Sequence, residues 1–92
     1  MTTMTLCQIV SLELRCSSEA ASARFDRLVN EGGHIWSYGD EKRRVCGVLR
    51  HFVDENDTDA RMSLSPDTID DVLADEIVES VVPKVIGKLE RL

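Results

Sequence analysis

The feature that most constrains the fold is an apolar stripe in residues 65–92 that changes sides near a proline. At 3.6 residues per turn, one apolar set lies on one face of a helix and consists of Ile69, Val72, Leu73 and Ile77. A second set around Pro83 is centred about 170° away by the same count and consists of Val82, Val85, Ile86, Leu89 and Leu92. One straight helix cannot turn both faces toward one core. The chain therefore either kinks or breaks at Pro83, or presents the second face to a partner.

The first third of the chain predicts a strand followed by a helix. In residues 5–16 one parity is apolar, as in a half-buried strand, and this set is Leu6, Val10, Leu12, Leu14 and Cys16. Ser17 or Ser18 then offers an N-cap, and Ala21, Phe25 and Leu28 follow at helical spacing. Gly32 and Gly33 end this predicted helix, because glycine tolerates the positive φ of a helix C-terminus.

Residues 43–53 admit two interpretations. Residues 34–38 form a short predicted strand rich in aromatic and β-branched residues, and a turn at residues 39–40 allows 43–53 to return as the second arm of a hairpin. The segment also fits a helix, whose apolar face would consist of Val45, Val48, Leu49, Phe52 and Val53. We favour the strand, because the run Val45-Cys46-Gly47-Val48 is β-branched and glycine-broken.

The remaining elements complete a predicted α+β fold. Residues 54–59 form a polar loop, residues 61–65 alternate as a last short strand, and Ser65 and Pro66 begin the C-terminal helix. We expect one domain over residues 1–92, because a chain of this length builds a single core. Its small antiparallel sheet has three or four strands in the order β-α-β-β-(β)-α, with an N-terminal helix and a long, proline-interrupted C-terminal helix.

Charge and cysteine usage limit the classes of partner. The net charge is −6, and residues 54–92 carry 11 Asp and Glu against four Lys and Arg. Such an acidic surface disfavours general binding to nucleic acid or to anionic membranes. The three cysteines cannot all pair within one chain, which indicates reduced thiols. With no signal peptide and no run of about 20 apolar residues, the sequence predicts a soluble, cytoplasmic protein.

Metal, cofactor and catalytic sites are not predicted. Residues 54–59 lack the spaced Gly and Glu of a calcium loop. The residues that could bind zinc lack the close ligand pairs of structural zinc sites; they are Cys7, Cys16, Cys46, His34 and His51. No phosphate-binding glycine loop, nucleophile elbow or pair of catalytic carboxylates is evident. We therefore predict a non-enzymatic protein without a cofactor.

Three functional hypotheses follow, of which the first is favoured. The first is an interaction module that forms homodimers or binds a protein partner through Val82, Val85, Ile86, Leu89 and Leu92. The second is an acidic inhibitor that mimics nucleic acid and binds a basic protein surface through Asp67, Asp70, Asp71, Asp75, Glu76 and Glu79. The third is a weak RNA or single-stranded DNA binder that uses Trp36, Tyr38, Lys42, Arg43 and Arg44.

Overall fold

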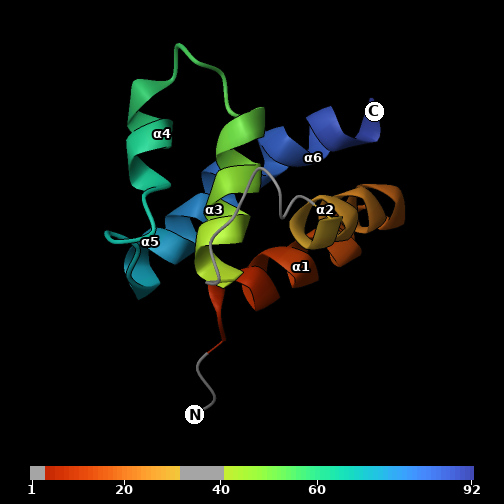
Figure 1. The fold of residues 1–92 in the computed structure, drawn as a ribbon, viewed down its shortest axis with the longest axis horizontal. Coiled ribbons are helices and arrows are strands. Elements are labelled where there is room, and N and C mark those ends of the chain that lie inside the picture. Colours follow the sequence, from red (N-terminus) through yellow and green to blue (C-terminus); the bar gives the residue numbers. More distant parts are fainter. Residues whose placement is uncertain (1–3, 32–40) are drawn as a thin grey trace.

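The computed structural model describes residues 4–31 and 41–92, and every regular element in these two ranges is a helix (Figure 1). In chain order they are α1 (Leu6–Ser17), α2 (Glu19–Glu31), α3 (Glu41–Phe52), α4 (Thr58–Ser63), α5 (Asp71–Glu76), the π-helix η2 (Ile77–Val81) and α6 (Val82–Glu90). The predicted α+β fold with an antiparallel sheet is therefore wrong, since the described ranges contain no strand. The predicted strand at residues 34–38 and its turn lie outside these ranges.

The predicted first strand is helix α1. Thr5 and Gln8 form a capping box: the Thr5 hydroxyl accepts from the Gln8 N–H at 3.2 Å, and the Gln8 side chain accepts from the Thr5 N–H at 2.9 Å. The buried side chains are four residues apart, at Leu6, Val10 and Leu14. This spacing fits a helix but also gives all three the same parity, which imitates a strand. Leu12 has the same parity but is 54% exposed, so the apolar parity of the predicted strand does not match the buried side of the segment.

The prediction of a helix after Ser18 is confirmed by α2. The Ser18 hydroxyl accepts a hydrogen bond from the Ala21 N–H at 3.2 Å, as an N-cap does. Ala21 and Phe25 are fully buried, and Leu28 packs against the core. The helix extends to Glu31, so the predicted stop at Gly32 and Gly33 lies just outside the described residues.

The favoured hairpin arm at residues 43–53 is wrong, and the helical alternative is what the structure contains. Val45, Val48, Leu49 and Val53 are all buried on one side of the segment, at the spacing of a helix face. Gly47 does not prevent this helix because its cost of about 1 kcal/mol is small beside the burial of several aliphatic side chains. Packing against the other helices therefore outweighs the β-propensity of the valines.

The predicted last strand at residues 61–65 is also wrong, because Thr58–Ser63 forms helix α4. Asp57 caps this helix: its carboxylate accepts from the Ala60 N–H at 3.2 Å. Leu64, which follows the helix, is fully buried, whereas Met62 is 70% exposed. A strand would have placed Met62 and Leu64 on the same face, but in the structure one side chain is exposed and the other is buried.

The C-terminal helix begins later than the sequence predicted. Ser65 does not cap a helix; its carbonyl accepts from the N–H and the hydroxyl of Thr68, at 3.1 and 3.0 Å, in a turn. The cap is Asp70, whose carboxylate accepts from the Leu73 N–H at 2.9 Å. Ile69 therefore lies before the helix, and Val72 on it is 69% exposed. The first of the two predicted apolar faces does not form as a unit.

A wide turn replaces the predicted kink or break at Pro83. The backbone stays in the right-handed helical region at Ile77, Val81 and Val82, while the Val82 N–H bonds to the Ile77 carbonyl, five residues earlier. Such a π turn contains one residue more than an α turn. Pro83 follows it in the first turn of α6, where the missing N–H is tolerated. The wide turn therefore carries the helix through the proline.

The extra residue brings Ile77 onto the same side as the apolar residues that follow it. In a regular α-helix Val82 would lie about 140° around the axis from Ile77. The five-residue turn reduces this angle, because Val82 then completes the turn that Ile77 begins. The structure accordingly buries both, together with Val81, Val85 and Leu89. The offset between Ile77 and the second apolar set in the sequence reflects this one extra residue.

α6 lies at the centre of the core and packs against α1, α2 and α3. Figure 1 shows it crossing behind α3 toward α2. Val82, Val85 and Leu89 on α6 have no exposed surface, and Val10, Leu14, Phe25 and Leu49 on the surrounding helices have none either. Each buried aliphatic side chain contributes about 1.5–3 kcal/mol, so this helix is central to the stability of the fold.

Removing the extra residue gives a direct test of the π turn. We expect deletion of exposed Ser80, in a Pro83→Ala background, to preserve helix content and cooperative unfolding. A regular α-helix would then keep the inward residues of this segment within about 100° of one another. Insertion of an alanine at the same place should abolish cooperative unfolding, because it rotates the inner side of α6 by about 100° away from the core. Circular dichroism melts compare both variants with Pro83→Ala alone. If the deletion and the insertion changed the melting transition equally, the assignment of a π turn with one extra residue would be wrong.

Gly87 allows a stabilising substitution in α6. A methyl group at this position would have no atom within 4 Å. Glycine in a helix interior costs about 1 kcal/mol relative to alanine. We therefore expect Gly87→Ala to raise the free energy of unfolding by about 1 kcal/mol in urea titrations. Ala23→Gly, at an exposed position of α2, is the reverse control and should lower it by a similar amount.

Candidate functional site

The apolar face predicted to bind a partner lies mostly in the protein's own core. Val82, Val85 and Leu89 are 0% exposed. Ile86 is half-buried and packs against the same core, so that only Leu92, 64% exposed, faces solvent. Of the five residues, three cannot reach a partner unless α6 leaves its place among α1, α2 and α3.

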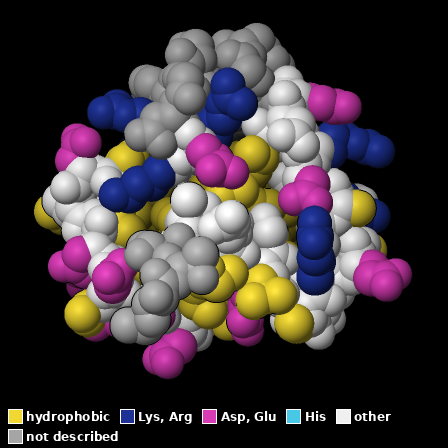
Figure 2. Space-filling model, turned by 90° about the horizontal axis from the view of Figure 1, so that it is seen from below, with side chains coloured by type: hydrophobic (Ala, Val, Ile, Leu, Met, Phe, Trp, Pro, Cys, Tyr) yellow, Lys and Arg dark blue, Asp and Glu magenta, His cyan; other side chains and the backbone are white. Residues whose placement is uncertain are grey.

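The six predicted acidic residues are all exposed. Asp71, Asp75, Glu76 and Glu79 lie within an arc of about 140° on the outer side of the helical rod formed by α5 and η2. Val72 lies inside this arc and is 69% exposed, whereas Ala74 and Ile77 on the opposite side are buried. Figure 2 shows carboxylates and exposed apolar side chains together on its left, the side of the molecule on which α5 lies in Figure 1. We call Asp71, Val72, Asp75, Glu76 and Glu79 the acidic face.

The other two predicted acidic residues have structural partners. Asp70 caps α5, as described above. Asp67 forms an ion pair with Arg43, whose guanidinium lies 3.5 Å from its carboxylate. Lys42 donates to the Ile69 carbonyl at 3.1 Å. The start of α3 is thereby connected to the segment that leads into α5.

Only part of the predicted nucleic-acid site lies within the described residues. Trp36 and Tyr38 lie outside the described residues. Of the basic triplet, Lys42 and Arg43 make the contacts with residues 67–69 just given, and Arg44 is half-buried. The structure does not place these cations on one freely exposed surface.

Basic side chains elsewhere mostly hold the ends of helices. Arg24 donates to the Leu89 carbonyl in the last turn of α6. Arg50 donates to the Leu64 carbonyl after α4 at 3.3 Å, and Arg61 to the Val53 carbonyl after α3 at 3.0 Å. The contacts supply donors to carbonyls at helix ends; the Leu89 carbonyl also accepts from the Leu92 N–H at 3.3 Å. At least six of the 11 Lys and Arg residues are engaged within the fold, when Lys42, Arg43 and Lys84 are included.

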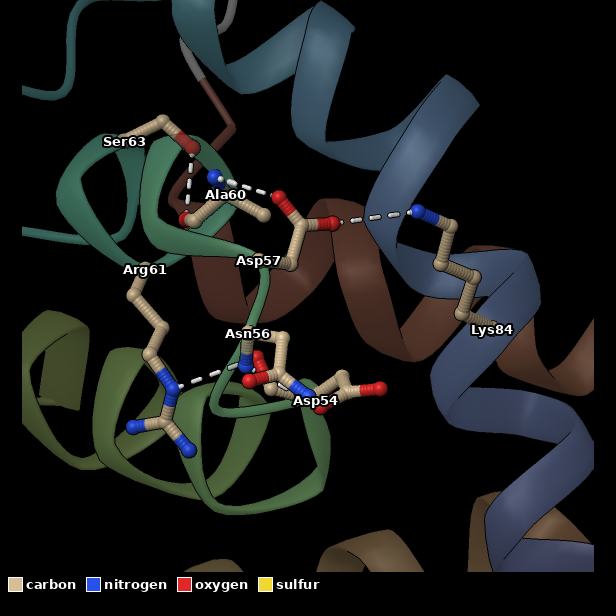
Figure 3. A network of polar contacts seen from close by, with 7 residues as sticks. All are labelled: Asp54, Asn56, Asp57, Ala60, Arg61, Ser63 and Lys84. Carbon is tan, nitrogen blue, oxygen red and sulfur yellow. Dashed lines mark hydrogen bonds and ion pairs between the residues drawn. The ribbon is translucent and has the colours of Figure 1, made fainter.

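A network around Asp57 joins α4 to α6 (Figure 3). One Asp57 oxygen accepts from the Ala60 N–H at 3.2 Å and the other from the Lys84 ammonium at 3.3 Å. The Ala60 hydrogen bond and then the Lys84 contact lower the pKa of the Asp57 carboxyl. Arg61 holds the same loop from the opposite side through the Asp54 carbonyl, at 3.4 Å.

A groove of about 320 Å³ lies between α4 and the α5–η2 rod. Its apolar floor contains buried Ile77 and Val81 and half-buried Ala60 and Leu73. Exposed Asp59 on α4 and exposed Glu76 on α5 line it from two sides, and the Asp57–Lys84 pair also contributes to its lining. Glu76 thus belongs both to the groove and to the acidic face.

The thiols form no disulfide. Cys7 is half-buried, Cys16 exposed and Cys46 buried, and all three are outside any disulfide. Burial and, secondarily, a hydrogen bond with Glu41 raise the pKa of the Cys7 thiol to about 11, which makes it a poor nucleophile. Among residues 4–31 and 41–92, no group of three or more His, Cys, Asp or Glu side chains could hold a metal ion. No described helix is both long and apolar enough to cross a membrane.

Comparison with protein-family models, with curated proteins and with solved structures finds no match to this chain. The evidence for the candidate site is therefore the geometry of the structure alone. Sequence reasoning identified the carboxylates of the acidic face, but it missed Asp59 and the apolar floor of the groove. The sequence of residues 54–59 predicts only a polar loop. Nothing in it indicates that α4 lies beside α5 and η2.

The Asp57 network predicts a pH dependence of stability. A carboxyl whose pKa is lowered in the folded state stabilises the fold above its unfolded pKa, near 4, and this contribution is lost as the pH falls through the folded pKa. Asp57→Asn keeps a helix-capping oxygen but loses the charge. We expect it to be less stable than the wild type at about pH 6, and we expect a smaller difference at about pH 3, where the wild-type advantage is partly lost. Urea titrations at both pH values test this, with Asp59→Asn as the neighbouring control; parallel pH profiles for wild type and Asp57→Asn would contradict it.

Proposed function

We propose that the protein is a small, non-catalytic interaction module that binds a basic protein surface through the acidic face. The observation that carries the proposal is the acidic face itself: four exposed carboxylates surround an exposed valine, and residues 67–80 contain no Lys or Arg. Among the described residues, no hydrogen bond or ion pair involves the carboxylates of Asp71, Asp75, Glu76 or Glu79. Their charge is therefore available to a partner.

The charge of this surface selects the class of partner. Asp71, Asp75 and Glu79 follow one another every four residues, about 6 Å apart along a regular helix. A row of negative charges repels nucleic acids and anionic lipids, but it complements the basic groove of a nucleic-acid-binding protein. The exposed Val72 adds an apolar contact beside the N-terminal end of the row. The proposed partner is accordingly a basic protein, and inhibition by nucleic-acid mimicry is the role that fits it.

The acidic face is a better interaction surface than the apolar residues near Pro83. Exposing Val82, Val85 and Leu89 would remove three fully buried side chains from the core, at about 1.5–3 kcal/mol each. The acidic face is accessible without any rearrangement. We place this function in the cytoplasm, because three cysteines without a disulfide suit a reducing compartment.

Charge neutralisation tests the proposal. The probe is a fluorescein-labelled, arginine-rich peptide, and its binding is followed by anisotropy. We expect the triple variant Asp71→Asn, Asp75→Asn, Glu79→Gln to bind roughly tenfold more weakly at low salt. We also expect a similar loss for the wild type when NaCl is raised from about 50 to about 500 mM, because exposed charges are then screened.

A control of equal charge separates local from general electrostatics. Glu13→Gln, Glu19→Gln, Glu55→Gln changes three exposed carboxylates outside the acidic face and alters the net charge equally. It should weaken binding by no more than about twofold. Equal losses for the two triple variants would show that only net charge attracts the peptide, and would refute the acidic face as a binding site.

A further inference from the structure

The groove beside the acidic face combines two chemical properties. Its floor is aliphatic, and carboxylates enter it from separate helices, Asp59 from α4 and Glu76 from α5. Among the described residues, neither carboxylate takes part in an ion pair or a hydrogen bond. A ligand group suited to both properties has an apolar stem and a cationic end.

Arginine matches this arrangement better than lysine. Its three methylene groups can lie on an apolar surface while its charge remains at the polar rim. Its planar guanidinium presents five donors in a fork that can serve two carboxylates at once, whereas an ammonium is a single point charge. The volume of about 320 Å³ lies at the lower end of the range for ligand pockets, so the groove suits one or two side chains and is too small for a whole helix.

We propose that this groove receives an arginine side chain of the basic partner, with its stem on Ala60, Leu73 and Ile77 and its guanidinium between Asp59 and Glu76. The inference rests on the proposed function, since the same partner contacts the acidic face next to the groove. It adds a specificity element: the acidic face attracts any basic surface, whereas the groove selects a long cationic side chain.

The hollow on the opposite side of the Asp57–Lys84 pair does not have this character. It is lined by Phe52, Asp54 and Asn56, and also by Lys84 and Lys88. The two ammonium groups offset the carboxylates of Asp54 and Asp57, so a cation gains little there. The Asp57–Lys84 pair also lines the groove between α4 and the α5–η2 rod, but among the described residues no further cation there offsets Asp59 and Glu76. Charge complementarity therefore assigns the arginine to this groove.

The first experiment varies the stem of the ligand at constant charge. The arginine-rich peptide is compared with one in which every arginine is replaced by 2-amino-3-guanidinopropionate, which keeps the guanidinium but lacks two methylene groups. We expect the wild-type protein to bind the shortened peptide at least about tenfold more weakly, because the stem no longer reaches the apolar floor. Equal affinities would overturn the groove while leaving the acidic face intact.

The second experiment fills the groove without a change of charge. Ser80 lines the groove and is exposed, so Ser80→Tyr places a ring there, and Ser17→Tyr at the exposed end of α1 is the matched control. We expect Ser80→Tyr, and separately Asp59→Asn with Glu76→Gln, to weaken the arginine peptide about tenfold and to abolish the preference for the longer stem. Circular dichroism melts establish that both tyrosine variants fold.

The outcomes distinguish the two proposals. If neutralising Asp71, Asp75 and Glu79 weakens binding but Ser80→Tyr does not, the proposed function stands and the groove is refuted. If neither change weakens binding, both are refuted. A second copy of this chain is the other possible occupant of the groove, and light scattering of the protein alone tests it. If the protein self-associated and Ser80→Tyr abolished this association, the groove would receive a second copy, and the inference would be wrong.

Discussion

The fold depends on one geometric constraint, which is that a helix with a proline must place apolar residues from both sides of the proline in one core. The π turn at Ile77–Val81 meets this constraint by adding a residue where Pro83 would otherwise clash with the preceding turn. α6 then lies between α1, α2 and α3, and its inner side is filled by Val82, Val85 and Leu89. Because the inner side is occupied, the rod presents its outer side, where the carboxylates lie, and its border with α4, where the groove lies.

The cations inside the fold stabilise its connections, and none of them comes from the α5–η2 rod. Arg24, Arg50 and Arg61 donate to carbonyls at or beyond helix ends, and Lys42 to the carbonyl of Ile69. These contacts satisfy backbone groups that helix ends leave open. The acidity of the rod comes from its own sequence, because residues 67–80 contain no Lys or Arg.

Sequence analysis predicted α2 and the carboxylates of residues 67–79, but it did not predict the all-helical fold. Leu6, Val10 and Leu14 satisfy both the strand and the helix pattern, and the capping box of Thr5 and Gln8 was the local signal that favours the helix. At residues 43–53 β-propensity favoured a strand, although packing decided for a helix. The groove could not be predicted, because it requires α4 to lie beside a rod that begins eight residues after α4 ends, and the two share no sequence pattern.

The groove wall is itself held by polar contacts. α4 has six residues and none of them is buried, so neither its length nor its burial keeps it in place. Its position depends on buried Leu64 after it, on the Asp57–Lys84 pair before it and on Arg61, which donates to the end of α3. An arginine between Asp59 and Glu76 would connect α4 directly to α5 and add a contact that the free protein lacks. The proposed binding is thereby coupled to local order: a cation that entered the groove would stabilise the wall that holds it.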